Sequence, residues 1–141
     1  MTPKRRRLWI SALVGGVLVY LIYLGLSPVA DVEASLEITP RVVTMRDKVV
    51  PAISLNNVSS NSTRRSSVVC RLYVDGRLFR EDRMRLPNPG RTETLTMTSG
   101  WLAEKEGNVE FKLIADENHR LKDPNRQNNT QTVIITVRPN S

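Results

Sequence analysis

The stretch VVCRLYVDG at residues 68–76 decides the fold class of this chain. Apolar residues occupy every second position, and strict alternation of this kind is typical of a β-strand with one buried face. The Asp75-Gly76 pair that follows is a strong hairpin signal, so a returning antiparallel strand is expected from Leu78 onward. The residues expected on the buried face are Val68, Cys70, Leu72 and Val74.

Further short strands are predicted on both sides of this hairpin. They are bounded by turn-forming stretches such as LPNPG at 86–90, and no convincing helical pattern lies between them. About seven short strands at regular spacing predict an all-β, immunoglobulin-like antiparallel β-sandwich over residues 36–138, followed by a tail at 139–141. Trp101 is expected to anchor its core or rim. The other predicted strands are 36–39, 42–45, 49–57, 92–98, 109–115 and 132–137.

The N-terminal stretch at residues 8–26 contains no charged side chain and directly follows a basic run at 4–7. As a helix it would extend about 28 Å, close to the ~30 Å hydrocarbon core of a bilayer. We therefore predict one transmembrane helix at 8–26, with residues 1–7 cytoplasmic and the remainder on the outer side. The residues expected at the membrane interface are Arg5, Arg6, Arg7, Trp9, Tyr20 and Tyr23.

The same segment has a second interpretation as a cleaved signal peptide. Cleavage would fall after Ala30 or Ala34, within the polar linker predicted at 27–35, but signal peptides carry a shorter apolar region. Length and flanking aromatics favour the anchor. Small residues spaced four apart would let a neighbouring helix approach one face, although such residues are also common in membrane helices. These residues are Ser11, Ala12, Gly15 and Gly16.

The amino-acid composition argues against several classes of function. The chain carries 21 Lys and Arg against 14 Asp and Glu, and four of the positive charges lie at 4–7. With aromatics at only 5%, a nucleic-acid surface is not expected. One cysteine allows no intramolecular disulfide, and one cysteine with one histidine allows no zinc centre of several His and Cys ligands. His119 lies in a polar loop, where a solvated side chain is expected and a catalytic triad is not. We therefore expect no enzyme, no cofactor and no small-molecule substrate.

The LYVDG hairpin at 72–76 and the Asp- and Asn-rich loop that ends in NN at 128–129, before the last strand, together resemble the CARDB family. This name stands for the cell-adhesion-related domain found in bacteria. The resemblance covers about residues 36–137 and implies an immunoglobulin-like module that lies outside the cytoplasm and has no catalytic activity. It names no ligand, and this chain is richer in arginine than the family pattern.

Two groups of polar residues are candidate sites. The loop at 116–129 gathers oxygen ligands of the type calcium prefers, although its Asp and Asn side chains equally suit bonds to their own backbone. Arginines in the middle of the domain are typical of a contact with a protein or an anionic lipid. The calcium candidates are Asp116, Asn118, Asp123 and Asn125; the partner-binding candidates are Arg71, Arg77, Arg80, Arg83 and Arg85.

Taken together, these features predict a single-pass protein of the bacterial cytoplasmic membrane with its domain on the periplasmic side. Its partners would be the lipid bilayer and other membrane-protein subunits, and its role would be that of an accessory subunit stabilising a larger complex. The short linker favours this hypothesis, because an adhesin would need a longer stalk or tandem repeats. The alternatives are a stand-alone adhesion or ligand-binding module at the cell surface, or a domain secreted after cleavage.

Overall fold

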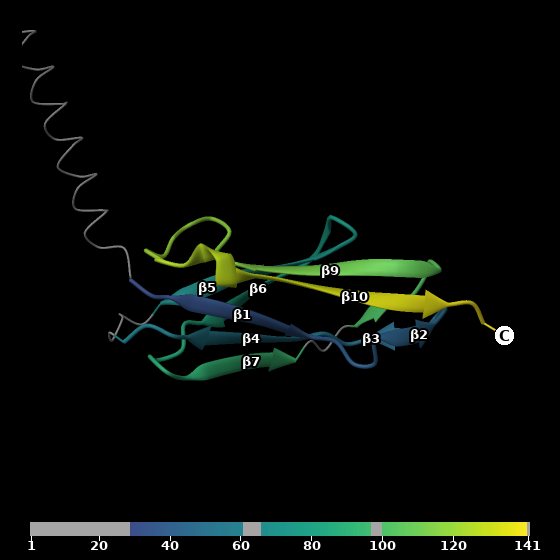
Figure 1. Ribbon diagram of the computed structural model, residues 1–141, viewed down its shortest axis with the longest axis horizontal. Helices are drawn as coiled ribbons and strands as arrows, with labels where there is room; N and C mark the ends of the chain where they lie inside the picture. The colour runs from purple at the N-terminus through teal and green to yellow at the C-terminus, as the bar shows by residue number, and fades with distance from the viewer. Residues whose placement is uncertain (1–28, 61–65, 97–99, 141) are drawn as a thin grey trace, which may run out of the picture.

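The computed structural model describes residues 29–60, 66–96 and 100–140, which form a β-sandwich (Figure 1). The predicted membrane segment, with its interface and helix-packing residues, lies outside these ranges. Within them, no helix is long and apolar enough to cross a membrane. The elements are β1 (Val32–Glu37), β2 (Val42–Thr44), β3 (Lys48–Val49), β4 (Ala52–Asn57), β5 (Ser67–Val74), β6 (Arg77–Arg85), β7 (Thr92–Thr96), β8 (Trp101–Leu102), β9 (Gly107–Ala115), the 3₁₀ turn η1 (Arg126–Asn129) and β10 (Thr130–Arg138).

The strands form two facing layers. One layer is a five-stranded sheet in the order β2-β10-β9-β5-β6, and the other contains the three-stranded sheet β1-β4-β7 and the short pair β3-β8 (Figure 1). All strand pairs are antiparallel except β10 with β2. Because neighbouring strands are mostly not consecutive in sequence, the chain crosses repeatedly between the layers, as in immunoglobulin-like folds. The predicted sandwich is confirmed.

The core lies between the two layers and is built from the alternating apolar positions of both. Phe111 and Leu72 from the five-stranded sheet and Ile53 and Leu55 from β4 are fully buried. Cys70 is 1% exposed, which confirms its predicted place on the core side. Every buried hydrophobic residue of the described core lies between positions 30 and 137. The sandwich therefore encloses its own core, as an independently folding domain does.

The β5–β6 hairpin forms as its sequence predicts. Asp75 and Gly76 both have positive φ, 47° and 76°, which is the backbone that a two-residue type I′ turn requires. The register then shifts: Tyr73 pairs with Leu78, whereas Leu72 pairs with Arg80. Phe79 is consequently an extra residue in β6, a β-bulge next to the turn.

The first strand starts earlier than predicted. Residues 32–35 belong to β1, where Val32 and Ala34 are buried, so they are not part of a linker and the predicted domain start at 36 is wrong. The pattern VEASLE alternates small and apolar residues with polar ones, and β4 pairs with it along its whole length. Val29 already forms a bridge with Lys122. Cleavage after Ala34 would therefore remove half of β1.

Other strand boundaries also differ from the predictions. The strand predicted at 49–57 is interrupted at Pro51, which has no N–H for the ladder, and becomes β3 and β4. Trp101 begins the short strand β8, and the polar loop at 116–129 closes with the turn η1.

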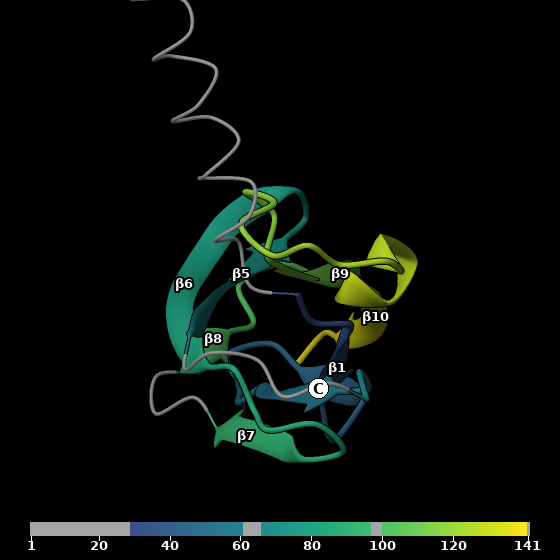
Figure 2. The same cartoon turned by 90° about the vertical axis from the view of Figure 1, so that its left-hand side faces the viewer.

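The elongated sandwich has two distinct ends. We call the end that carries residues 29–31, 85–91 and 116–128 the tether end, because the chain enters the domain there (Figures 1 and 2). Cys70 pairs with Ala115 and Val74 with Phe111, so β5 runs away from this end. The β5–β6 turn, β8 and the end of β10 therefore make up the opposite end, which we call the far end.

Candidate functional site

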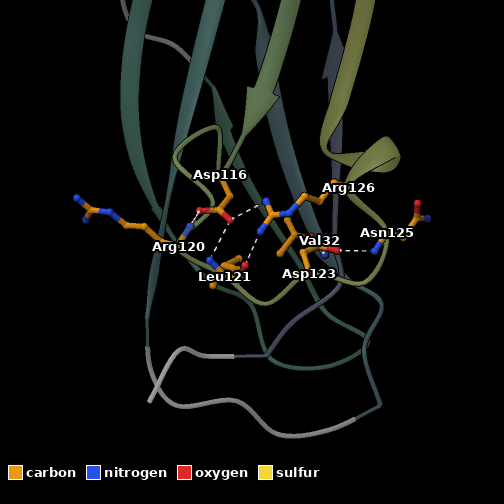
Figure 3. A network of polar contacts seen from close by, with 7 residues as sticks. All are labelled: Val32, Asp116, Arg120, Leu121, Asp123, Asn125 and Arg126. Atoms are coloured by element: carbon orange, nitrogen blue, oxygen red, sulfur yellow. Dashed lines mark hydrogen bonds and ion pairs between the residues drawn. The ribbon is translucent and has the colours of Figure 1, made fainter. Parts of the chain in front are cut away.

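The loop after β9 is organised around one buried carboxylate (Figure 3). Asp116 is 4% exposed and accepts the backbone N–H groups of Arg120 and Leu121, both at 2.9 Å. The guanidinium of Arg126 lies 3.3 Å from the same carboxylate and completes a half-buried ion pair. Asp116 itself has a φ of 51°, a left-handed conformation that Asp and Asn tolerate better than most residues. These contacts fold the loop back on its own backbone.

A second carboxylate in the loop fixes the start of β1. Asp123 accepts the N–H of Val32 at 3.1 Å and that of Asn125 at 2.9 Å. The Asn128 amide adds a hydrogen bond to Asp31 at 2.9 Å. The loop and β1 are thereby joined although some 90 residues separate them in the sequence.

This arrangement does not bring the predicted calcium ligands together. Asp116 faces a guanidinium, the Asn118 amide oxygen accepts from Arg71 at 3.2 Å, and the Asn125 amide points away from the network (Figure 3). The described residues contain no group of three His, Cys, Asp or Glu suited to a metal ion. The loop instead matches the alternative prediction, in which its polar side chains satisfy its own backbone. His119 is exposed and takes part through its backbone N–H alone among the contacts described.

Arg71 cross-links three elements on the outer face of the five-stranded sheet. Its guanidinium lies 2.7 Å from Glu81 of β6 and 2.6 Å from Glu117 of the loop. The Tyr73 hydroxyl donates to the same Glu117 at 2.8 Å. The hydrogen bond from Arg71, followed by that from Tyr73, lowers the pKa of Glu117, and the bond to Glu117 raises the pKa of Tyr73. The Arg71 guanidinium is therefore engaged with β6 and the loop.

Arg80 has a different structural role. Its register partner is the inward-facing Leu72, and its guanidinium forms a two-pronged ion pair with Asp82 at 2.6 and 3.0 Å, where both side chains are partly buried. Charged side chains that point inward from an edge strand discourage pairing with other chains. Burial, and to a smaller extent the nearby Asp82, raises the pKa of the Cys70 thiol to about 12, which makes it inert.

The five predicted arginines therefore do not form one binding surface. Arg71 and Arg80 make the structural contacts above, whereas the others are exposed. Of these, Arg77 lies at the far end, while Arg83 and Arg85 lie on β6 toward the tether end. Strand alternation and the bulge send these side chains to different faces and ends, and a partner contact through the exposed arginines stays a prediction.

The far end carries a feature that was not predicted from the sequence. A hollow of about 560 Å³ is lined by residues from the start of β6 and from β8. These two strands belong to different layers but lie along the same edge of the sandwich (Figure 2). Leu78 and Leu102, which line it, are 54% and 46% exposed, and Phe79 is 36% exposed. Trp101 joins this hollow to the core, because its ring packs edge-on against Phe111 with centroids 5.3 Å apart. The charged residues around it are Asp75, Arg77, Glu104 and Lys105.

One signal in the sequence could have indicated this hollow. Leu78 and Phe79 are consecutive, and side chains of consecutive strand residues point to opposite faces, so they cannot both be buried in a regular strand. An apolar pair next to a tight turn thus indicates either a bulge or an exposed apolar side chain, and here both occur. The position of Leu102 beside them depends on the pairing of β8 with β3, which no local pattern reveals.

Comparison with known proteins identifies the fold. No family model matches the chain, and no curated protein matches it in sequence. The CARDB domain of a Pyrococcus furiosus protein, crystallised in complex with di-metal ions, has a TM-score of 0.69 at 22% identity over 77% of this chain and 94% of that chain. A domain of a Methanosarcina acetivorans protein described as a cell surface protein gives 0.58 at 17% identity, over 78% of this chain and 93% of that chain.

A similar sandwich also occurs inside an enzyme. A β-glucosidase from Erythrobacter marinus gives a TM-score of 0.54 at 14% identity, over 77% of this chain but only 16% of its own length. These likenesses establish an immunoglobulin-like sandwich of the CARDB type, and at such identities they establish the fold alone.

Proposed function

We propose that this chain is a non-enzymatic accessory subunit of a larger bacterial membrane protein complex. In this proposal residues 8–26 anchor it in the cytoplasmic membrane with the N-terminus inside, and the sandwich docks on the extracytoplasmic part of a neighbouring subunit. The observation that carries the proposal is the apolar hollow at the far end, formed by Leu78, Phe79, Trp101 and Leu102.

Exposed apolar side chains around a hollow are typical of a protein contact. Burying a large apolar side chain completely stabilises by roughly 1.5–3 kcal/mol, so covering Leu78, Phe79 and Leu102, which are about half exposed, would contribute roughly 1 kcal/mol each. A partly buried tryptophan such as Trp101, which lines the hollow, is typical of a binding hot spot. Charges of both signs at the rim favour a partner that presents an apolar residue flanked by polar groups.

The geometry of attachment supports a partner in the same membrane. Val29 is already part of the domain, so only residues 27 and 28 separate it from the end of the predicted helix at Leu26. Such a short connection would hold the sandwich at the bilayer surface with the hollow about one strand length away. β10 spans about 30 Å at ~3.3 Å per residue, which suits contact with the protruding part of a neighbouring membrane protein.

The test is extraction of the full chain from its native membrane in mild detergent, followed by native electrophoresis. We expect migration with a large complex, and we expect the double substitution Leu78→Ser/Leu102→Ser to shift the protein to a small species. The matched control is Ile134→Ser, which removes an exposed apolar side chain, 55% accessible, from β10 outside the hollow. Migration of the wild-type chain as a small species, or an equal shift by the control, would contradict the proposal.

A stand-alone adhesion module is the second candidate. The similarity to CARDB domains and to a domain described as part of a cell surface protein favours it. The same electrophoresis separates the two functions, since an adhesion module would run as a small species whether or not the hollow is altered.

A further inference from the structure

At the tether end, acidic and basic side chains differ in their exposure to solvent. Within residues 29–31, 85–91 and 116–128, every exposed ionisable side chain other than His119 is basic, and every carboxylate is buried or half-buried. The exposed cations are Arg85, Arg91, Arg120 and Lys122, and the carboxylates are Asp31, Asp116, Glu117 and Asp123.

The sequence of the loop gives no hint of this, because residues 116–126 contain three acidic and three basic side chains and are formally neutral. Folding buries or half-buries the acidic side chains of this loop and leaves Arg120 and Lys122 exposed. The Asp116 carboxylate pairs with Arg126 and accepts hydrogen bonds from two backbone N–H groups. The Asp123 carboxylate accepts hydrogen bonds from two other backbone N–H groups, and the Glu117 carboxylate contacts Arg71 and Tyr73. The backbone N–H of Arg120 donates a hydrogen bond to Asp116, whereas its side chain extends away from this network (Figure 3). The surface that remains is basic.

The far end shows no such difference. Its exposed charged residues include both signs in close proximity, among them Asp75, Glu104 and Glu106 beside Arg77, Lys105 and Arg138. Exposed carboxylates near the tether end, such as Glu33 and Glu93, lie on β1 and β7 of the other sheet and not on the end itself. The basic character is therefore a property of one end and not of the whole surface.

We propose that the tether end is a membrane-contact surface that binds anionic lipid headgroups through Arg85, Arg91, Arg120 and Lys122. The backbone of Lys122 forms an isolated β-bridge with that of Val29, the first residue that the structure describes. This surface therefore lies where the chain leads back to the predicted membrane span. Charges attract an anionic bilayer within a Debye length, about 8–10 Å at physiological salt. The contact would orient the sandwich upright and direct the hollow away from the membrane.

A lipid surface fits these residues better than a nucleic acid does. No Phe, Tyr or Trp lies in residues 29–31, 85–91 or 116–128, so bases would find no stacking platform there. Scattered flexible cations at the rim of a domain suit a fluid layer of headgroups, which needs charge but no fixed geometry.

The proposal rests on the proposed membrane anchor but not on docking through the hollow, and it can be tested on the sandwich alone because that domain encloses its own core. Residues 27–141 are sedimented with phosphatidylcholine vesicles that contain either no phosphatidylglycerol or about one third of it. We expect binding only to the anionic vesicles, weakened by added salt. At about 1 kcal/mol per basic residue, the triple substitution Arg85→Gln/Arg120→Gln/Lys122→Gln should weaken binding roughly 100-fold.

The matched control is Lys48→Gln/Lys105→Gln/Arg138→Gln, which removes the same net charge from exposed positions toward the far end. The control variant should bind anionic vesicles with an affinity close to that of the unsubstituted domain. Equal losses in the two triple variants would overturn the proposal, because net charge and not the tether end would then decide binding. Failure to bind anionic vesicles, equal binding to neutral vesicles, or stronger binding to single-stranded DNA than to vesicles would also overturn it. The electrophoresis proposed above would be unaffected by any of these outcomes.

Discussion

Replacing Asp116 with Asn is the sharpest test of the loop at the tether end. Asparagine has the same shape and also tolerates the positive φ of this position, so the substitution changes the charge and one acceptor while leaving the backbone preference intact. The wild-type carboxylate accepts three donors, from Arg120, Leu121 and Arg126, although it is almost fully buried.

The magnitude follows from these contacts. The amide retains one acceptor oxygen, and its NH₂ group must face at least one donor that the carboxylate had satisfied. Hydrogen bonds to a charged group contribute about 1.5–3 kcal/mol each, and a buried unsatisfied donor costs about 1–3 kcal/mol. We therefore expect Asp116→Asn to lower the free energy of unfolding by about 2–4 kcal/mol. For a domain of this size that corresponds to a fall in Tm of about 10–20 °C.

The assay is urea unfolding of residues 27–141 followed by fluorescence, where Trp101 is the one tryptophan. Its ring packs on core residue Phe111 and reports loss of the core directly. The control is Glu106→Gln, the same chemical change at an exposed carboxylate. A difference below about 0.5 kcal/mol between the two variants would refute the argument, because surface changes of this kind usually stay within that range.

Three further predictions concern reactivity, pH and metal. Cys70, with a pKa of about 12, should not react with a thiol reagent at pH 8 in the native domain and should react at once after unfolding; rapid native labelling would contradict its burial. Because Arg71 and Tyr73 lower the folded pKa of Glu117, its stabilising contribution is present above the unfolded pKa and is lost as pH falls through the folded value. Glu117→Gln should therefore flatten the loss of Tm in acid below about pH 4.3 relative to wild type, and an unchanged acid profile would show that this contact does not contribute. Millimolar calcium should leave the Tm of chelator-treated protein unchanged, since the loop carboxylates are already engaged, and a clear rise would show that the loop can rearrange into a cation site.

Much of the fold could be predicted because it rests on local patterns. The alternation around Leu72 and the Asp75-Gly76 turn require only the period of a strand and the sterics of positive φ, and both features appear in the structure as predicted. The boundary at Val32 was not predicted although VEASLE at 32–37 alternates buried and exposed residues. The stretch directly follows the apolar N-terminal segment, and its pairing with β4 along its full length shows that it is a strand of the domain and not a linker.

The candidate sites were less predictable, because the position of a side chain depends on strand register and on distant partners. The calcium site and the partner-binding arginines were predicted from residue type alone. In the structure the calcium candidate Asp116 pairs with Arg126, and the arginine candidate Arg80 turns inward to Asp82. The exposed apolar hollow arises from a one-residue bulge at Phe79 and from β8, which is placed beside it by pairing with β3. Neither the bulge nor the pairing of β8 with β3 produces a clear periodic pattern in the sequence.

The sequence by itself determined the fold class of this protein: an all-β sandwich, preceded by an apolar segment of membrane-spanning length, in a chain with one histidine and one cysteine. Alternation and composition are local properties, so they can be read without knowledge of the partners. The tertiary structure decided which charges reach the surface. At the tether end, bonds from distant backbone and side-chain donors draw the carboxylates inward and leave Arg120 and Lys122 exposed. The distribution of charge on a surface is fixed by such long-range contacts, and for that reason it cannot be derived from a loop whose formal charge is zero.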